Sequence, residues 1–152
     1  MLATVDGDAA DARVVVVREV EVRLKQLLFY TDERAGKVAQ LLRHSRGTLV
    51  MGCPDLGWQV RCKVRLALEM SGLSSASRWA RVKLTPAAQG YLSPLPPGSP
   101  VSPVPHPDFG TAARNHFAVI TGCVVAIDWL ELHPDGHRRA RLARDSMQWL
   151  HP

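Results

Sequence analysis

Basic and hydrogen-bonding side chains recur at separate points in the first part of the chain. Arg13 opens a valine-rich segment, Tyr30 and Thr31 end the next segment of strand character, and Lys37 lies in the first turns of a predicted helix. Free backbone amides, a hydroxyl and long cations can converge at such a place, where the helix dipole also favours an anion. These residues therefore predict a binding corner for a phosphate group.

A second polar pair, Gln59 and Arg61, lies on a later predicted strand. The two residues are two positions apart, so their side chains point to the same face of that strand. A glutamine side chain offers both a donor and an acceptor, which suits the edge of a heterocycle with alternating polar groups. Each of these residue types is also common on solvated surfaces, so the prediction depends on their combination.

Metal chemistry is not expected. His133 and His137 have the spacing of a helical metal pair, but the Pro-Asp-Gly sequence between them indicates a turn, and no carboxylate-rich or cysteine partner lies nearby. The sequence also contains no Walker loop, no G-x-S-x-G and no G-x-G-x-x-G. We therefore predict no metal site and identify no catalytic acid, base or nucleophile.

The composition is that of one globular domain with an anionic partner. The 152 residues are 46% hydrophobic and 22% charged, which predicts a single domain over residues 1–152. The net charge is +5, but aromatic residues make up only 6% and the bases are spread along the chain, which favours a phosphorylated small molecule over a nucleic acid. No apolar run could span a bilayer, the N-terminal segment is acidic, and the cysteines form no C-x-x-C pair. We therefore expect a cytoplasmic protein with no membrane partner.

The elements that must position these groups are mainly strands. The pattern predicts six or seven strands, at residues 13–22, 25–31, 48–53, 58–70, 117–132, 137–143 and 148–151. Two helices are predicted, one that begins at Asp32 as its N-cap and buries a face including Leu42, and one over residues 75–84. Gly122 is the expected position of a β-bulge. The fold class is therefore mainly β, a β-barrel with flanking helices.

A proline-rich segment at residues 91–110 interrupts this pattern. Such a segment cannot form a packed helix or a central strand. Two interpretations stay open: a lid or arm over a neighbouring subunit, and an exposed linker.

The order of these features resembles the pyridoxamine 5′-phosphate oxidase family and its FMN-binding split-barrel relatives. That family has R-x-V-L-L-K, F-Y-T-N followed by S-R-K, and L-G-x-Q-V-R in the same order. The corresponding segments here are R-V-V-V-V-R at residues 13–18, F-Y-T-D at 29–32, Lys37, and L-G-W-Q-V-R at 56–61. Residues 127–132, 137–141 and 149–152 also resemble the family's C-terminal tail, so the resemblance covers most of the chain except the proline-rich segment.

The resemblance implies an FMN-binding split barrel that forms a homodimer, with the cofactor at the subunit interface. Residues 13–18 and Tyr30-Thr31 would border the ribityl chain and phosphate, and Lys37 would pair with the phosphate. Gln59 would reach the flavin from the partner subunit, and one of Arg139 and Arg141 would approach the ring. The full set of implied cofactor-binding residues is Arg13, Val14, Val15, Val16, Arg18, Tyr30, Thr31, Lys37, Gln59, Arg61, Arg139 and Arg141.

Several positions depart from the family's pattern. Residues 35–37 read Ala-Gly-Lys in place of S-R-K, Leu130 replaces a tryptophan near the flavin, and Arg18 replaces a lysine. The R-x-x-x-S element that grips the substrate phosphate has no clear counterpart over residues 79–91. FMN binding is expected to survive these departures better than the oxidation of a vitamin B6 substrate does.

We therefore predict an FMN-dependent oxidoreductase of unidentified substrate, for which pyridoxamine 5′-phosphate is a poor substrate. One alternative is a protein that binds a flavin, a deazaflavin or haem without turning over a substrate. Another is a basic, nucleic-acid-binding β-barrel, which only the high isoelectric point favours.

Overall fold

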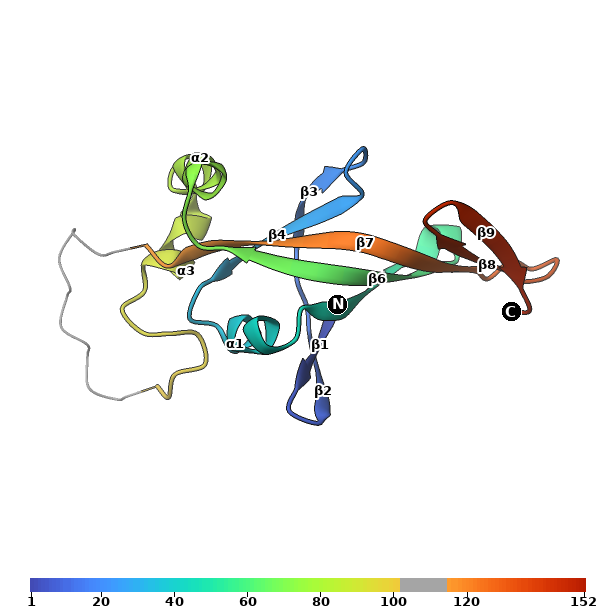
Figure 1. The fold of residues 1–152 in the computed structure, drawn as a ribbon, viewed down its shortest axis with the longest axis horizontal. Helices are drawn as coiled ribbons and strands as arrows, with labels where there is room; N and C mark the ends of the chain where they lie inside the picture. The colour runs from blue at the N-terminus through green and yellow to red at the C-terminus, as the bar shows by residue number, and fades with distance from the viewer. Residues whose placement is uncertain (102–114) are drawn as a thin grey trace.

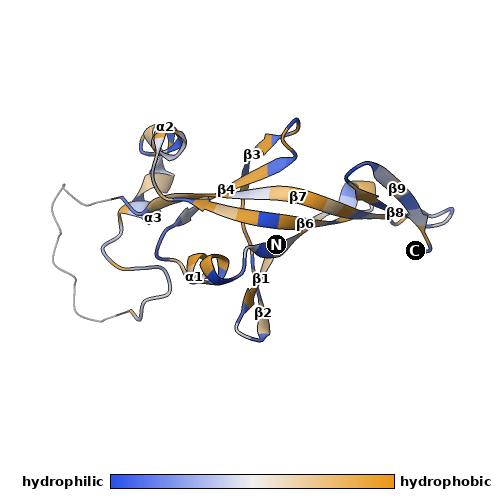
Figure 2. Cartoon of the chain, in the orientation of Figure 1, coloured by the Kyte–Doolittle hydropathy of each residue, from blue (hydrophilic) through white to orange (hydrophobic). Residues whose placement is uncertain are grey.

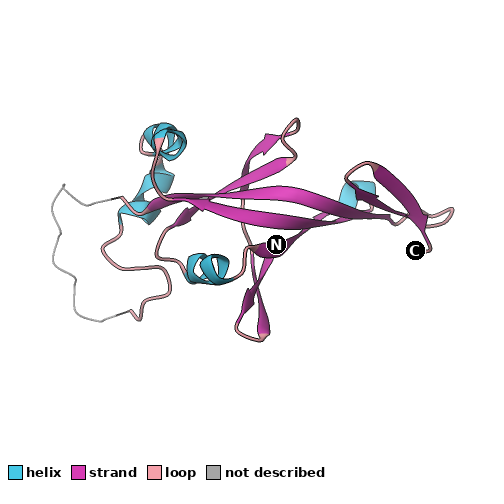
Figure 3. Ribbon diagram, viewed as in Figure 1, coloured by secondary structure: helices cyan, strands magenta, loops and turns pink. Residues whose placement is uncertain are grey.

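The computed structural model describes residues 1–101 and 115–152 and is dominated by strands (Figures 1 and 3). In these ranges the strands are β1 (Leu2–Asp6), β2 (Ala9–Arg13), β3 (Val17–Glu21), β4 (Gln26–Asp32), β5 (Arg46–Cys53), β6 (Trp58–Glu69), β7 (Phe117–Glu131), β8 (Arg138–Ala143) and β9 (Ser146–Leu150). The helices are α1 (Gly36–Arg43), α2 (Leu73–Val82) and α3 (Gln89–Leu92), with the short 3-10 turns η1 (Pro54–Leu56) and η2 (Pro86–Ala88).

All strands belong to one antiparallel sheet built around the long β6–β7 ribbon. The strand order is β2-β1-β5-β6-β7-β4-β3. The first half of β7 pairs with β4 and its second half with β8, which in turn carries β9. Figure 1 shows the ribbon running from α2 and α3 at one end to the β8–β9 hairpin at the other.

Two apolar clusters cover the two faces of the β4–β7 region. The larger cluster joins Phe29, Leu49 and Ile120 of the sheet to Leu41 of α1. Alternate residues of β6 are buried in it, as the period of two in a strand requires. The smaller cluster packs Phe117 and its strand neighbours against the α2–α3 segment. Figure 2 shows the apolar residues concentrated along β4, β6, β7 and α1. Leu28 belongs to the smaller cluster and Phe29 to the larger one, so consecutive residues of β4 face different environments.

The valine-rich run is divided between two strands, which corrects the prediction of one strand over residues 13–22. β2 ends at Arg13, residues 14–16 form a connection without strand pairing, and β3 begins at Val17. The tight turn at Gly7, whose φ is +62°, folds β2 back on β1 so that Arg13 lies opposite Leu2. The chain then crosses to the opposite end of the sheet. Strand propensity is equally satisfied by one strand and by two strands with an extended connection.

The start of the first helix also differs from the prediction. Asp32 is the last residue of β4, and α1 begins only at Gly36, with Ala35 as its N-cap. The Asp32 carboxylate accepts hydrogen bonds from the backbone N–H and the guanidinium of Arg34 at 2.7–3.0 Å, which holds it away from the helix. Leu42, assigned to the buried face, is 68% exposed. The predicted N-cap was therefore wrong by three residues, because the Asp32–Arg34 pair forms a turn before the helix.

The predicted bulge at Gly122 is also wrong. Gly122 pairs regularly with Leu27 and Leu66, and the register of β6 and β7 shifts instead at Val125. A Cβ on Gly122 would lie 3.5 Å from the ring of Phe29, so this glycine lies against a core aromatic residue. The prediction of a single long strand over this segment is confirmed by β7.

The proline-rich segment begins with α3, and residues 93–101 have no regular structure. The Arg34 guanidinium donates hydrogen bonds to the carbonyl groups of Ser93, Pro94 and Leu95, which fixes the start of the segment against the end of β4. The later part of the predicted loop, residues 102–110, lies outside the described residues.

Candidate functional site

Arg13, Thr31, Lys37 and Gln40 meet where β2, β4 and α1 converge, and we call this group the phosphate corner. The Lys37 ammonium donates a hydrogen bond to Thr31 Oγ1 at 3.2 Å. Burial, and then the nearby charge of Arg13, lower the pKa of Lys37. No carboxylate of the described residues forms an ion pair with Lys37. The corner therefore contains a half-buried cation that has no ion-pair partner among the described residues and that the Asp32 charge influences only from a longer distance.

Arg13, in contrast, already has an ion-pair partner. Its guanidinium forms a salt bridge with Asp11, donates to Gln40 Oε1 at 2.8 Å, and also contacts the hydroxyl of Thr4. Gln40 is buried and donates its amide to Asp11 at 2.7 Å, and this bond is the largest cause that lowers the pKa of Asp11. The network orients Arg13 beneath α1 and leaves Lys37 as the cation open to a ligand.

The N-terminus of α1 adds donors to the phosphate corner. No side chain caps this helix, and its first turn contains no acidic residue, so its first backbone N–H groups lack a side-chain acceptor. A Cβ added to Gly36 would meet no atom within 4 Å, so the space beside this turn is open. The sequence-predicted convergence of Arg13, Thr31 and Lys37 is thus observed, although Ala35 and Gly36 contribute no polar side chains.

The connection over residues 14–16 runs on from the corner. Val15 packs against the core, whereas the side chains of Val14 and Val16 are 81% and 57% exposed. The two exposed valines offer an apolar surface next to a cationic corner. Such a surface suits the uncharged part of a phosphorylated ligand.

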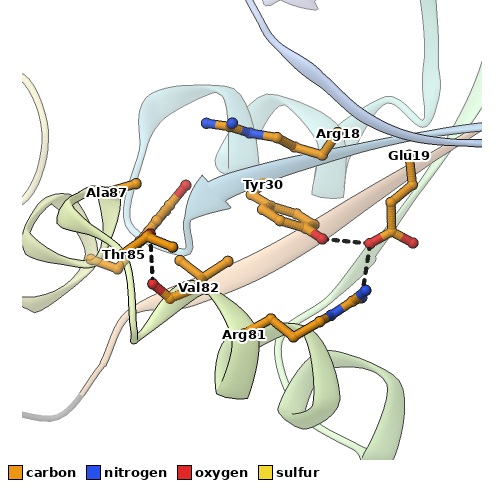
Figure 4. A pocket seen from close by; sticks show the side chains of 8 residues that line it. Arg18, Glu19, Tyr30, Arg81, Val82, Thr85 and Ala87 are labelled. Atoms are coloured by element: carbon orange, nitrogen blue, oxygen red, sulfur yellow. Dashed lines mark hydrogen bonds and ion pairs between the residues drawn. The ribbon is translucent and has the colours of Figure 1, made fainter.

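Tyr30 does not join Thr31 at the corner, because consecutive strand residues point to opposite faces. Its side chain instead lies in a separate cavity of about 270 Å³ between the β3–β4 hairpin and the α2–α3 segment (Figure 4). We call this cavity the Tyr30 pocket. Its lining residues are Arg18, Glu19, Tyr30, Arg81, Val82, Thr85, Ala87 and Tyr91.

A bulge in β3 directs two neighbouring side chains into this pocket. The pairing of β3 with β4 shifts between Val17 and Glu19, which leaves Arg18 as the extra residue. In a regular strand Arg18 and Glu19 would face opposite sides, but a bulge re-aims a side chain, and both residues line the pocket. The Arg18 guanidinium lies 6.0 Å from the centre of the Tyr30 ring.

Arg81 and Thr85 are pocket residues that the sequence analysis missed. They are four positions apart, Arg81 in the last turn of α2 and Thr85 at the N-cap of η2, and both line the Tyr30 pocket. The spacing is that of the R-x-x-x-S element for which no counterpart was found, with threonine in place of serine. Accepting either hydroxyl residue at the last position would have identified the pair.

The remaining predicted site residues share one face of the extended β6–β7–β8 segment, which we call the arginine face. Gln59 lies opposite Leu130, which lies opposite Arg139, and the next row of that face is Arg61, Asp128 and Arg141. Residues directly opposite each other in a sheet point to the same side. The segment also borders a hollow of about 400 Å³.

Asp128 forms ion pairs with Arg61 and Arg139 but not with Arg141. Its carboxylate accepts hydrogen bonds from Arg61 at 2.8 Å and from Arg139 at 2.9 and 3.0 Å. The bond from Arg139 is the largest cause that lowers the pKa of Asp128. The Arg141 guanidinium is exposed and forms no hydrogen bond or ion pair with another side chain of the described residues. Arg141 is therefore the arginine available to a ligand.

The phosphate corner and the arginine face are not brought together within one chain. In Figure 1 the β8–β9 end of the ribbon extends away from α1. The structure thus forms one group from Arg13, Thr31 and Lys37, and another from Gln59, Arg61, Arg139 and Arg141.

Neither a metal cluster nor a membrane helix is found in residues 1–101 and 115–152. No three His, Cys, Asp or Glu side chains lie together there as a metal would require. No helix there is both long and apolar enough to cross a bilayer.

Solved structures share this fold over nearly the whole chain. A pyridoxamine 5′-phosphate oxidase-related, FMN-binding protein from Nostoc punctiforme aligns with a TM-score of 0.78 and 25% sequence identity, covering 99% of this chain and 86% of that one. The chain has a pyridoxamine 5′-phosphate oxidase-like fold. The mainly β, split-barrel architecture predicted from the sequence is thereby confirmed.

Two further structures support the pyridoxamine 5′-phosphate oxidase-like fold. PhzG from Burkholderia lata, in complex with tetrahydrophenazine-1-carboxylic acid, aligns with a TM-score of 0.79 and 16% identity, covering 99% of this chain and 80% of that one. A NimC/NimA family protein from Clostridium acetobutylicum aligns with a TM-score of 0.55 and 13% identity, covering 93% and 82% of the two chains. No family model and no curated protein matches the sequence.

Proposed function

We propose that this chain binds FMN, with the cofactor phosphate at the phosphate corner, and acts as an FMN-dependent oxidoreductase. The observation that carries the proposal is Lys37, a half-buried ammonium that donates to Thr31 but has no carboxylate partner among the described residues. A phosphate would supply the missing counter-charge, and a charge-assisted hydrogen bond contributes about 1.5–3 kcal/mol. The FMN-binding relative from Nostoc punctiforme supports the same cofactor.

The corner fits a phosphate despite the missing serine and arginine of the S-R-K triplet. The uncapped first turn of α1 supplies backbone donors, and the open space beside Gly36 gives room for the phosphate oxygens. Thr31 and Lys37 would hold the phosphate, and Gln40 would keep Arg13 in place behind it. The exposed Val14 and Val16 would lie along the ribityl chain.

We propose a homodimer because the arginine face lies away from the corner of its own chain. A two-fold interface uses the same surfaces on both subunits and therefore lets each subunit complete the other's site. Gln59 and Arg141 of one subunit would then approach the flavin held by the other. Trp58 and Trp149, which the pairing of β6, β7, β8 and β9 places at the same end of the sheet, are 38% and 63% exposed and would gain from burial in such an interface.

The division of labour between cofactor and protein follows from this arrangement. FMN, when bound, supplies the capacity to accept and return electrons. The residues of the dimer would bind and orient it: Lys37 and Thr31 of one subunit would fix the phosphate end, and Arg141 of the other subunit would place a positive charge beside the ring. The Tyr30 pocket, on the other face of β4, is the place we propose for the substrate.

Titration of the flavin-free protein tests the cofactor. We expect the fluorescence of FMN to fall on binding. We also expect FMN to bind about ten- to a hundredfold more tightly than riboflavin, because only FMN carries the phosphate. FAD serves as the control, because its flavin phosphate is joined to a second phosphate and is not a free monoester. Equal affinity for FMN and riboflavin would contradict the placement of the phosphate.

An anaerobic reduction assay tests the oxidoreductase function. NADH or NADPH is added to the FMN-saturated protein, and the flavin absorbance is followed before and after admission of oxygen or an artificial acceptor. Reduction and reoxidation at rates of about 1 per second or more are expected of an enzyme. A protein that binds FMN and is not reduced by any donor would be a carrier.

A further inference from the structure

Glu19 is the shared hydrogen-bond acceptor of Tyr30, Arg78 and Arg81 at the Tyr30 pocket. Its Oε1 accepts hydrogen bonds from the Tyr30 hydroxyl at 2.5 Å, from Arg78 Nε at 3.0 Å and from Arg81 at 3.2 Å. Its Oε2 accepts a further bond from Arg78 at 2.9 Å, so Arg78 grips the carboxylate with two nitrogens. Figure 4 shows Glu19 reaching between Tyr30 and Arg81. Two guanidinium groups and a phenol are the donors that would otherwise hold an anionic group of a ligand.

The ionisation of this cluster is consistent with its geometry. The hydrogen bonds from Arg78 are the largest cause that lowers the pKa of Glu19, so its carboxylate is charged at neutral pH. Burial, and then the bond to Glu19, raise the pKa of Tyr30, so its hydroxyl remains a donor. The side chains of Arg78 and Glu19 are only 17% and 21% exposed, which limits competition from water.

We propose that Glu19 is a specificity-determining residue: its carboxylate occupies the place of a ligand's anionic group against Arg78, Arg81 and Tyr30, so that the Tyr30 pocket accepts an uncharged aromatic ligand and excludes phosphate monoesters. As a statement about the substrate this rests on the proposed oxidoreductase function. As a statement about binding it depends only on the pocket. A phosphate brought beside Glu19 would meet a negative charge that already holds Arg78 through two hydrogen bonds and Arg81 through one.

The rest of the pocket wall is suited to a flat, uncharged ring. Tyr30 and Tyr91 offer aromatic surfaces, and Val82 and Ala87 add apolar contacts. The Thr85 hydroxyl donates to the Val82 carbonyl at 2.8 Å and is therefore engaged as a donor. The volume of about 270 Å³ suits a small aromatic molecule.

The remaining cation is Arg18, which is exposed to solvent and lies over the Tyr30 ring. A single solvated guanidinium gives little attraction for an anion compared with a directed set of buried donors. The Arg18 guanidinium could also contact the face of an aromatic ligand through a cation–π interaction.

Benzyl alcohol and benzyl phosphate are suitable probes, because they share one ring and differ only in the phosphate. Binding of each to the FMN-saturated wild-type protein is followed by NMR at the backbone amides of Thr85 and Tyr91. We expect benzyl alcohol to shift these amides at millimolar concentration and benzyl phosphate to bind at least about tenfold more weakly. In Glu19→Gln, which keeps the shape and removes the charge, benzyl phosphate should bind about ten- to a hundredfold more tightly than to wild type.

Glu21→Gln is the matched control, because Glu21 lies two residues along β3, is exposed, and carries the same charge outside the pocket. It should leave both affinities within about twofold of wild type. Benzyl phosphate that binds wild type at Thr85 and Tyr91 as tightly as benzyl alcohol would overturn the proposal. So would a folded Glu19→Gln variant with unchanged phosphate affinity, or benzyl alcohol that does not bind at these residues.

The comparison of the two probes on wild type decides the proposal even if Glu19→Gln does not fold. The amide of Lys37 reports on the phosphate corner in the same spectra, so a failure of FMN to bind is seen separately from the behaviour of the Tyr30 pocket.

Discussion

Two cations of the phosphate corner have the same charge but different neighbours. Arg13 is held by Asp11 and Gln40, whereas Lys37 is half-buried beside a hydroxyl. The sequence predicted that both would reach one place, since each lies near the end of an element. It could not predict the Asp11–Gln40 network, because these residues meet only when β2 folds under α1. At the residue scale, we therefore propose Lys37 as the phosphate ligand, because Arg13 already has a counter-charge.

The charge of Glu19 should appear in the pH dependence of stability. Its folded-state pKa lies below the ordinary value of 4.5, so the stability it contributes is present above that value and is lost as the pH falls through the folded pKa. We expect the difference in free energy of unfolding between wild type and Glu19→Gln to be constant from about pH 6 to 8 and to shrink below about pH 4.5. Urea unfolding at a series of pH values measures it. A difference that is independent of pH down to pH 3 would contradict the ion pair with Arg78.

Pyridoxamine 5′-phosphate is expected to be a poor substrate, as the sequence also predicted. Its phosphate would have to displace Glu19 from Arg78 and Arg81. Turnover is measured at saturating FMN with oxygen as acceptor, and it should rise in Glu19→Gln relative to Glu21→Gln. Wild-type turnover of about 1 per second or more would show that the pocket holds phosphate.

At the scale of elements, the sequence predicted the long strands well and the first half of the chain less well. β6 and β7 were recognised because alternation and valine-rich composition persist over many residues. The run around Arg13 was read as one strand because a connection of three valines has the same local pattern as a strand. The bulge at Arg18 could not be predicted, since it depends on the register between β3 and β4. That bulge lets both Arg18 and Glu19 line the Tyr30 pocket.

The tight connection into β6 depends on Gly57. Its φ is +62°, and an added Cβ would lie 2.4 Å from the carbonyl oxygen of Leu132. Gly57→Ala should therefore cost more than the roughly 1–2 kcal/mol of a left-handed alanine. Gly7→Ala is the matched control, with the same φ of +62° and no atom within 4 Å, and should cost only that amount. Chemical denaturation of both variants tests this, and equal losses would mean that the Leu132 carbonyl moves away easily.

At the scale of the whole molecule, the arginine face and the phosphate corner, which the proposed dimer would bring together, lie apart in one chain. This separation could not be predicted from the sequence, because the spacing of Gln59 from Lys37 does not show where β6 extends. The resemblance to dimeric flavoproteins implies a homodimer with a shared site, and the long β6–β7–β8 segment is the feature that such a dimer would use.

Subunit complementation tests the composite site. Lys37→Met removes the cation of the corner, and Arg141→Ala removes the exposed arginine of the other face, so each variant alone should bind FMN at least about tenfold more weakly. A coexpressed mixed dimer, isolated with two different tags, should regain one site of wild-type affinity per dimer. Light scattering should report a dimer throughout. A monomer that is saturated with FMN, or a mixed dimer without recovery, would contradict the shared site.

The central claim is that Lys37 binds the phosphate of FMN, and the most direct measurement compares FMN with riboflavin in wild type and Lys37→Met. Lys83→Met, at the exposed C-terminal cap of α2, is the control for loss of a lysine charge. We expect Lys37→Met to weaken FMN binding about ten- to a hundredfold, to leave riboflavin binding unchanged, and so to abolish the preference that wild type and Lys83→Met retain. Equal weakening of both flavins, or an unchanged affinity for FMN, would show that the phosphate lies elsewhere.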